Sequence, residues 1–324
     1  MDREQRNFKM DNTKALLIFL VVFGHFLELF KGDISAFLSL LIYSFHMPAF
    51  AFCSGYFAKW NPRHLIQRIL YPYVCFQVLY LLFGKFFLGD PFSHPFTRPY
   101  WLMWYLMSLF FWYLLLPVID RYQHFRLWFI TGAVALALLI GFVPWAGYRF
   151  SFSRTVVLFP FFLTGYLCRN VWESSLQALK KRGSMAGSLL CLVMLGCILL
   201  LWSNRLSIKP EWLYHSTSYA LGGYSIRIRG LLLLNAGIWT SWLLFYLPGR
   251  RIPIVSALGR HTMAVYLLHG FFLKLAKANG LLSGSQAVNL TASFLLSLLL
   301  CLLLGNPMTE RLFHFLFSAE WQKH

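Results

Sequence analysis

Apolar runs follow one another along nearly the whole chain, and this pattern constrains the fold more than any other feature. Crossing about 30 Å of hydrocarbon takes roughly 20 residues of α-helix. Ten runs of that order lie at 15–30, 36–57, 69–88, 101–119, 127–143, 148–168, 185–202, 228–247, 252–273 and 287–305. Helices and closed barrels alone satisfy their backbone polar groups inside lipid, and these runs have helical length. The sequence therefore predicts an all-α membrane protein, a polytopic bundle of about ten transmembrane helices forming one domain over residues 1–324.

The chain is strongly basic, with 29 Lys and Arg against 11 Asp and Glu. In a soluble protein such a surplus suggests nucleic acid as a partner, but 58% hydrophobic and 12% charged residues exclude a soluble fold. If the N-terminus is cytoplasmic, 18 of the 29 basic residues fall on inner connections, including Lys180-Lys181-Arg182 and Arg250-Arg251. Because cytoplasmic loops carry the excess of Lys and Arg, we expect a multi-pass protein of the cytoplasmic membrane with both termini inside and no nucleic acid partner.

Three histidines are expected at similar depth in the membrane. His25 lies about 16 Å along a helix from Lys14, His46 lies near the middle of the next run, and His269 lies roughly 13 Å beyond Arg260. Lys14, His25 and Glu28 share one helical stripe. Ionisable side chains are costly in lipid, so this stripe is a functional candidate, and a carboxylate beside an imidazole favours general-base chemistry. The alternative is that His25 is a packing residue bonded to a backbone carbonyl.

Other polar and aromatic residues have competing interpretations. Arg149 and Arg154 flank a short apolar run and are expected either to face a cavity or to extend to the outer surface. Arg63 and Arg68 either bind phosphates or anchor the inner end of a helix. The one long external connection, about 203–227, is rich in aromatic residues, which suits a membrane interface or stacking on a sugar. The six cysteines form no CxxC pair and have no histidine at ligand spacing, so no metal site is predicted.

Two blocks of sequence carry a family resemblance. The first is Asp11-Asn12-Thr13-Lys14 leading to Gly24-His25, and the second is Phe45-His46-Met47-Pro48 followed by Ser54-Gly55-Tyr56. Weaker matches follow at Arg68–Tyr73, Trp104–Leu106, Phe159–Phe162, Gly165-Tyr166 and Leu258–Arg260 leading to His269. Over about residues 8–270 the chain resembles the integral-membrane acyltransferase-3 family, and within it the fucose 4-O-acetylase-like branch. Lys14 stands where arginine is usual, and lysine lacks the planar fork that binds phosphate or carboxylate through two hydrogen bonds.

The resemblance implies a membrane O-acyltransferase that moves an acetyl or similar short acyl group from acetyl-CoA to a hydroxyl of a cell-surface or exported polysaccharide or glycolipid. By position, it makes His25 the catalytic histidine and Lys14 its basic partner. Acetyl-CoA is then a co-substrate and the lipid bilayer and a carbohydrate are the other partners, while the acceptor sugar and the oligomeric state stay open. A glycolipid or polysaccharide transporter, or a regulatory membrane protein, are the alternative functions.

Roles for the other polar residues follow from this reaction. His46 or Glu28 would orient His25, and the sequence does not separate direct transfer from an acyl-histidine intermediate. Some of four basic residues are expected to hold coenzyme A phosphates: Lys14, Arg63, Arg68 and Arg126. The remaining substrate-binding candidates are Arg149, Arg154, Trp104, Tyr105 and His269, with the two aromatic residues also suited to an interfacial belt.

Overall fold

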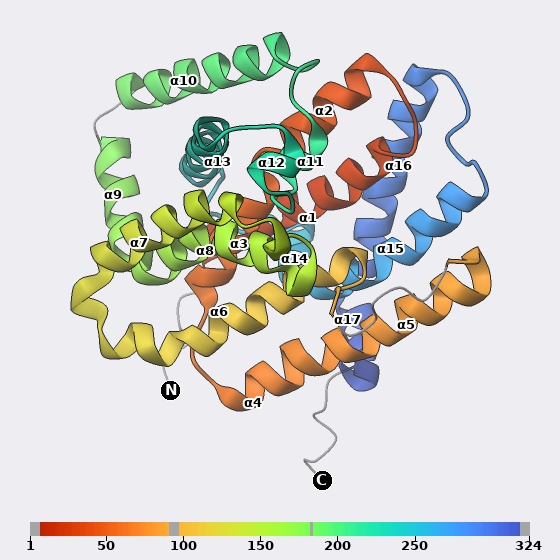
Figure 1. The fold of residues 1–324 in the computed structure, drawn as a ribbon, viewed down its shortest axis with the longest axis horizontal. Helices are drawn as coiled ribbons and strands as arrows, with labels where there is room; N and C mark the ends of the chain where they lie inside the picture. Colours follow the sequence, from red (N-terminus) through yellow and green to blue (C-terminus); the bar gives the residue numbers. More distant parts are fainter. Residues whose placement is uncertain (1–6, 91–96, 182–183, 318–324) are drawn as a thin grey trace. The chain divides into compact units, whose positions relative to one another are not determined.

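The computed structural model describes residues 7–90, 97–181 and 184–317. Within these ranges every regular element is helical (Figure 1). The α-helices are α1 (Phe8–Leu27), α2 (Asp33–Tyr43), α3 (His46–Phe57), α4 (Pro62–Leu65), α5 (Tyr71–Leu88), α6 (Trp104–Arg121), α7 (Arg126–Leu139), α8 (Phe152–Leu167), α9 (Arg169–Lys181), α10 (Ser184–Ser203), α11 (Pro210–Leu213), α12 (Tyr219–Gly222), α13 (Ile226–Tyr246), α14 (Pro253–Leu258), α15 (Thr262–Ala278), α16 (Gln286–Leu304) and α17 (Pro307–Phe317). A π segment, η1 (Ile66–Leu70), and five 3₁₀ segments complete the set: η2 (Trp101–Met103), η3 (Gln123–Phe125), η4 (Ile140–Phe142), η5 (Pro144–Ala146) and η6 (Arg149–Ser151).

Eight helical stretches of the described chain are long and apolar enough to cross a membrane. They are Phe8–Leu27, Asp33–Phe57, Pro62–Leu88, Trp101–Arg121, Gln123–Phe142, Arg149–Leu167, Ile226–Tyr246 and Gln286–Leu304. This confirms the predicted all-helical polytopic class. Two of the ten predicted spans have no counterpart among the eight: 185–202 corresponds to a shorter apolar helix, Gly187–Ser203, and 252–273 is divided between α14 and α15.

The division of the predicted span 252–273 has a packing cause. The chain turns at Gly259, where a Cβ would overlap the backbone carbonyl of Asp11 in α1. The side chain of Asn12 also fixes the segment before α14, because its amide donates to the carbonyls of Pro248 (2.8 Å) and Arg250 (3.1 Å). These contacts come from a helix remote in sequence, so hydropathy alone could not place the break.

The predicted span 36–57 is also two helices, α2 and α3, separated by a turn at Ser44 and Phe45. Pro48 has no N–H to give the Ser44 carbonyl, so an uninterrupted α-helical ladder cannot pass this point. The Ser44 side chain is held on both sides, donating to the Leu41 carbonyl at 2.8 Å and accepting from the Asn235 amide at 3.1 Å. His46 is consequently the first residue of α3.

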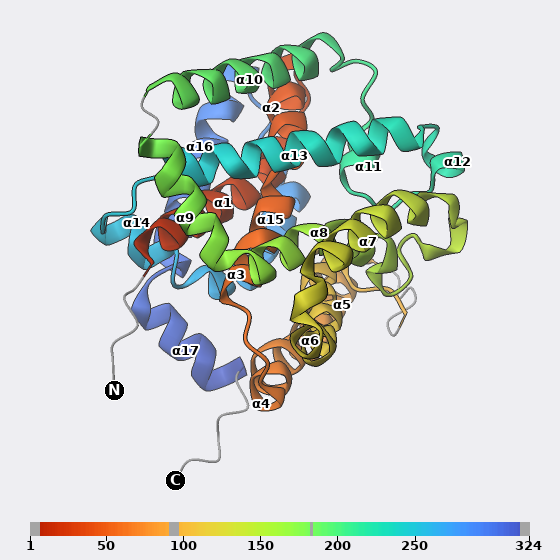
Figure 2. The same ribbon diagram turned by 90° about the vertical axis from the view of Figure 1, so that its left-hand side faces the viewer.

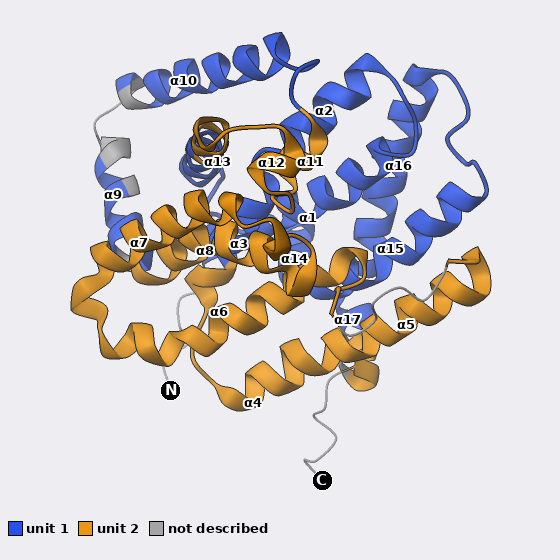
Figure 3. Ribbon diagram, viewed as in Figure 1, with its two compact units in different colours: residues 1–53, 168–208, 234–310 blue, residues 54–167, 209–233, 311–324 orange. Residues whose placement is uncertain are grey.

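The described chain packs as two compact units, shown in different colours in Figure 3. Unit 1 comprises residues 1–53, 168–208 and 234–310, and unit 2 comprises 54–167, 209–233 and 311–324. In unit 1, α1 packs against α2, α14, α15 and α16 (Figure 2). In unit 2, α8 packs against α6 and α7, and Gly55 in α3 lets the backbone of Phe162 approach so closely that a Cβ would overlap its carbonyl. Four of the 18 basic residues that the sequence assigns to the inner side lie outside the described residues: Arg3, Arg6, Arg182 and Lys323.

Candidate functional site

His25 lies in the last turn of α1, two residues before the helix ends at Leu27. The sequence placed it near the middle of a helix over 15–30, but α1 begins earlier, at Phe8, where the Asn7 side chain accepts from the Met10 N–H. Glu28 is therefore the C-cap residue rather than a helical one. Its Oε2 lies 3.4 Å from His25 Nδ1, and the two side chains are 12% (His25) and 33% (Glu28) exposed.

Tyr43 joins His25 to His46. The Tyr43 hydroxyl lies 2.8 Å from His25 Nδ1, and the Tyr43 ring meets the rings of His25 and His46 edge-on, at 5.9 and 5.0 Å between centroids. Gly24 permits this approach, because its Cα faces Ile42 and Tyr43, and a Cβ there would sit 3.3 Å from Ile42 Cγ2. The sequence-based reasoning missed Tyr43, although its place three residues before His46 was a usable signal.

His269 completes a cluster of three histidines in unit 1. Its ring stacks on that of His25 at 5.8 Å between centroids, with the planes inclined by 24°. His46 Nδ1 donates to the Ile42 carbonyl and His269 Nδ1 to the Val265 carbonyl, both at 2.8 Å. Each of these two rings therefore keeps its lone pair on Nε2, and the buried Nε2 of His269 has no hydrogen-bond partner among the described residues. The structure thus brings together all three histidines that the sequence placed in one layer.

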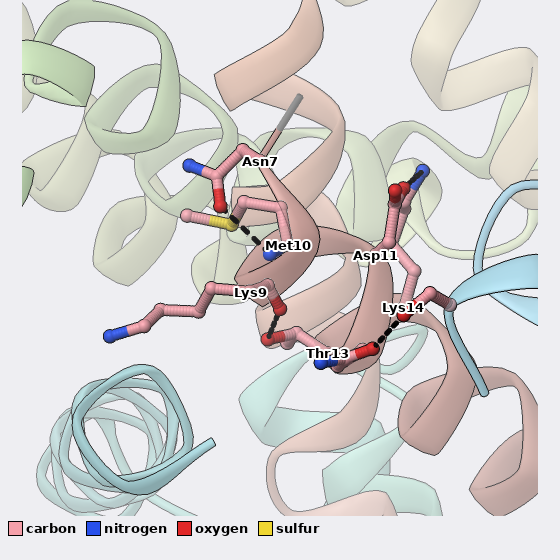
Figure 4. A network of polar contacts seen from close by, with 8 residues as sticks. Asn7, Lys9, Met10, Asp11, Thr13 and Lys14 are labelled. Atoms are coloured by element: carbon pink, nitrogen blue, oxygen red, sulfur yellow. Dashed lines mark hydrogen bonds and ion pairs between the residues drawn. The ribbon is translucent and has the colours of Figure 1, made fainter. Parts of the chain in front are cut away.

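Lys14 is engaged with an acidic residue one turn earlier on α1. Its Nζ lies 3.4 Å from Asp11 Oδ1, and Asp11 is 5% exposed (Figure 4). On the same turns, the Thr13 hydroxyl donates to the Lys9 carbonyl at 2.8 Å (Figure 4). A buried carboxylate requires a cation, so Asp11 fixes the position of the Lys14 ammonium. The sequence analysis named Asp11 only as part of the family resemblance and gave it no role in the site.

Unit 2 holds a second polar cluster, centred on two arginines. The Arg154 guanidinium lies over the rings of Trp104 (4.9 Å), Tyr148 (5.4 Å) and Tyr214 (6.0 Å), and its side chain is partly buried. Tyr105 is buried, and its hydroxyl lies 2.8 Å from Ser54 Oγ. The interfacial-belt interpretation of Tyr105 is therefore wrong, because its polar end is bonded inside the protein.

Arg229 is fully buried, at 0% exposure. Its guanidinium donates to the Thr217 carbonyl (3.0 Å) and to the Tyr224 hydroxyl, and lies over the Tyr219 ring at 4.7 Å. Within the part of the chain that the structure describes, no carboxylate pairs with it. The sequence analysis did not select Arg229, although a single cation inside the apolar run 228–247 was a usable signal.

His215 lies beside both arginines, in the connection between α11 and α12. Burial and the neighbouring Arg229 and Arg154 lower its pKa from 6.5 to about 3, so it is neutral at physiological pH. Its backbone is left-handed (φ 53°), and its carbonyl accepts from Ser153 Oγ at 2.7 Å. Such backbone strain persists only where surrounding contacts enforce it.

The connection that the sequence predicted to be external, about 203–227, is more compact than its aromatic content suggested. Trp212, Tyr219 and Tyr224 are 7–8% exposed, and Trp212 stacks on Tyr224 at 5.4 Å between ring centroids. Most of its aromatic surface is thus buried within unit 2 and does not form an open platform for a sugar.

The other candidate arginines lie on the surface. Arg63 in α4, Arg68 in the π segment η1, Arg126 at the start of α7 and Arg149 in η6 are all exposed side chains of unit 2. Their exposure suits either phosphate binding or helix anchoring. Among the described residues no group of three or more His, Cys, Asp or Glu side chains is arranged to hold a metal ion.

Comparison with known proteins identifies the family. A model of the acyltransferase domain of the acyltransferase-3 family matches residues 7–306. The chain is 22% identical to nodulation protein NolL of Mesorhizobium japonicum over 299 residues, covering 83% of this chain and 77% of the relative. It is 23% identical to nodulation protein NolL of Sinorhizobium fredii over 304 residues, covering 83% and 79%. No solved structure matches significantly. The chain therefore belongs to the acyltransferase-3 family and is a membrane acyltransferase.

Proposed function

We propose that this protein is an O-acetyltransferase of the cytoplasmic membrane, with both termini in the cytoplasm. It transfers an acetyl or similar short acyl group from acetyl-CoA to a hydroxyl of a cell-surface or exported polysaccharide or glycolipid, as in the fucose 4-O-acetylase-like branch. The observation that supports this most is the arrangement around His25, whose Nδ1 lies 2.8 Å from the Tyr43 hydroxyl and 3.4 Å from a Glu28 carboxylate oxygen.

The tautomer of His25 follows from its neighbours. An ionised carboxylate only accepts hydrogen bonds, and a phenol oxygen accepts as well as donates, so both oxygens are acceptors for a proton on Nδ1. The lone pair of the ring then lies on Nε2, which acts as the general base. In the reaction, Nε2 takes the proton of the acceptor hydroxyl while that oxygen attacks the thioester carbonyl. The tetrahedral intermediate then expels the coenzyme A thiolate, which takes up the proton from the imidazolium.

An acyl-histidine intermediate uses the same atoms in two steps. Nε2 attacks the thioester and expels the coenzyme A thiolate, which takes up the Nδ1 proton of the acylimidazolium. The acceptor hydroxyl then attacks the acyl-imidazole, and its proton returns to the imidazole ring. In either route His46 positions His25 through Tyr43, and His269 packs against the face of the reacting ring. Lys14, held by Asp11, supplies positive charge on the same helix as His25.

The aromatic cage around Arg154 suits the acceptor. Trp104 and Tyr148 flank a cation, a combination that binds sugars through ring stacking and hydrogen bonds to hydroxyl oxygens. Arg149, exposed in the preceding 3₁₀ segment, and Tyr105 extend this proposed acceptor region. Arg63, Arg68 and Arg126 stay predictions for contacts with phosphate groups.

The proposal is tested with membranes that contain the protein, incubated with acetyl-CoA labelled in the acetyl group. Label is expected in the polysaccharide or glycolipid fraction, and absent from membranes lacking the protein. Acetyl-CoA labelled in its adenine should transfer nothing, which separates acyl transfer from adsorption of coenzyme A. Accumulation of glycolipid on one membrane face without transfer of acetyl label would instead establish a transporter and reject the proposal.

A further inference from the structure

A cavity lies at the N-terminal end of α1, whereas His25 lies near its C-terminal end. It has a volume of about 260 Å³ and is lined by Phe8, Arg251, Ser256 and Arg260, all of which belong to unit 1. Phe8 is the first residue of α1, whereas the two arginines flank the short helix α14 on either side. The side chains of Arg251 and Arg260 are exposed. The cavity uses none of the residues placed around His25.

The wall of this cavity is built by buried hydrogen bonds. Ser256 Oγ donates to Asn12 Oδ1 at 2.7 Å and accepts from the Ile252 N–H at 2.9 Å. Asn12 and Ser256 are 1% and 3% exposed, and the Asn12 amide also holds the carbonyls of Pro248 and Arg250. Gly259 packs directly on the Asp11 backbone. The segment that carries both arginines is thus fixed to α1 at several points, so their backbone positions do not depend on a ligand.

The two arginines of the cavity have no acidic partner in the part of the chain that the structure describes. Neither Arg251 nor Arg260 pairs with a carboxylate there. Two guanidiniums facing one cavity favour a ligand with more than one phosphate, because each binds phosphate oxygens through two parallel hydrogen bonds. Phe8 presents an aromatic ring in the same wall, on which a planar base can stack.

The distance between the cavity and His25 favours a ligand whose phosphates lie far from its reacting group. Phe8 and His25 are 17 residues apart on one continuous helix, which is about 26 Å at 1.5 Å per residue. A thioester donor bound with its acyl group at His25 must place its phosphates well away from that ring, at the end of a long flexible arm. One rigid helix therefore carries both the proposed base and a cationic cavity at its far end.

We propose that this cavity binds the phosphorylated adenosine end of the acyl donor, with Arg251 and Arg260 holding phosphates and Phe8 stacking on adenine. The inference rests on the proposed function and assigns to it a donor site other than Lys14, Arg63, Arg68 and Arg126. Lys14 is already engaged by Asp11, whereas the two cavity arginines are not engaged by any described carboxylate.

Two acyl donors distinguish an effect on phosphate binding from an effect on catalysis. Acetyl-CoA carries the phosphates, and S-acetylpantetheine carries the same thioester without them. In the double variant Arg251→Gln/Arg260→Gln, the KM for acetyl-CoA is expected to rise at least tenfold, while the KM for S-acetylpantetheine changes less than twofold. Arg250→Gln removes a neighbouring charge whose side chain does not line the cavity, and should leave both constants near those of the native protein.

A second measurement keeps the inference testable if no acyl transfer is detected. The native protein in phosphatidylcholine vesicles should bind adenosine 3′,5′-bisphosphate in calorimetry, and the double variant should lose at least tenfold in affinity. If neither thioester donates its acetyl group but the bisphosphate still binds, the proposed function is rejected and the proposed phosphate site is retained.

Three outcomes would overturn the inference. In the first, the KM values for the two thioesters rise equally in the variant Arg251→Gln/Arg260→Gln. In the second, that variant changes neither KM, and Arg63→Gln/Arg68→Gln raises the KM for acetyl-CoA alone. Alternatively, the bisphosphate would not bind and the arginines would affect only association with vesicles containing anionic lipid, which would identify a lipid headgroup as the ligand.

Discussion

The histidine cluster of unit 1 and the arginine cluster of unit 2 differ in exposure and in charge. His25 is partly exposed, pairs with a carboxylate and a phenol, and belongs to the residue type that most readily exchanges a proton near neutral pH. Arg229 is sealed from solvent and donates to a carbonyl and a phenol oxygen, with no described carboxylate beside it. In the proposed mechanism unit 1 provides a proton acceptor, whereas unit 2 holds a permanent positive charge. The difference predicts that mutations in unit 1 change rate and those at Arg229 change stability first.

His25→Ala should have the largest effect. Loss of a general base lowers rates by about 10²–10⁴-fold. Acetyl transfer in membranes is the measurement, with protein amount and thermal unfolding recorded beside it. His124→Ala, which removes an exposed histidine from η3 in unit 2, is the matched control and should transfer acetyl normally. Full activity of His25→Ala would remove the basis for the proposed mechanism.

Arg229→Met should lower the free energy of unfolding by about 1–3 kcal/mol, because the Thr217 carbonyl and the Tyr224 hydroxyl lose a buried donor. Arg227→Met, two residues earlier on the same helix and exposed, should change it by less than about 0.5 kcal/mol. Thermal unfolding in detergent compares the two. Equal melting temperatures for both variants would show that the buried guanidinium has no structural role.

His215 should make unfolding depend on pH. Its pKa is about 3 in the folded protein, against an ordinary value of 6.5 for a solvated histidine, so only the unfolded chain binds a proton in between. Stability is therefore retained above pH 6.5 and lost as pH falls toward 3, by at most about 1.4 kcal/mol per pH unit. His215→Asn removes the titration and tolerates the left-handed backbone. Unfolding midpoints measured from pH 7 to pH 5 should fall more steeply for the native protein, and parallel curves would contradict this assignment.

Tyr43→Phe should reduce the transfer rate roughly tenfold, because a hydrogen bond to a reacting group contributes about 1.4 kcal/mol and the ring packing is kept. Glu28→Gln should have a smaller effect, since its oxygen is farther from Nδ1 and the side chain is a third exposed. The ratio of the two rates, with protein amounts equalised, is the measurement. A larger loss in Glu28→Gln would make the carboxylate the principal orienting group.

The parts of this molecule that the sequence could predict are those set by local pattern. Long apolar runs must be helices in lipid, so the helical class and most spans were predictable, and a spacing of eleven residues put Lys14 and His25 on one stripe. The break at Gly259 and the contact between Tyr43 and His25 could not be predicted. They depend on contacts that Asn12 and Gly24 make with residues distant in the sequence. The caging of Arg229 likewise depends on how residues 214–224 fold back on α13.

Lys14→Arg should have the smallest effect and sharpens the comparison between the two kinds of cation. Asp11 accepts an arginine as readily as a lysine, so the charge stays on the same turn of α1 and activity should remain within about threefold of the native value. Lys14→Met, which removes the ammonium beside a 5% exposed carboxylate, should be both less stable and less active. Transfer rates and thermal unfolding of both variants distinguish charge from geometry. A stable but inactive Lys14→Arg protein would show that the compact ammonium, and not its charge alone, is required beside Asp11.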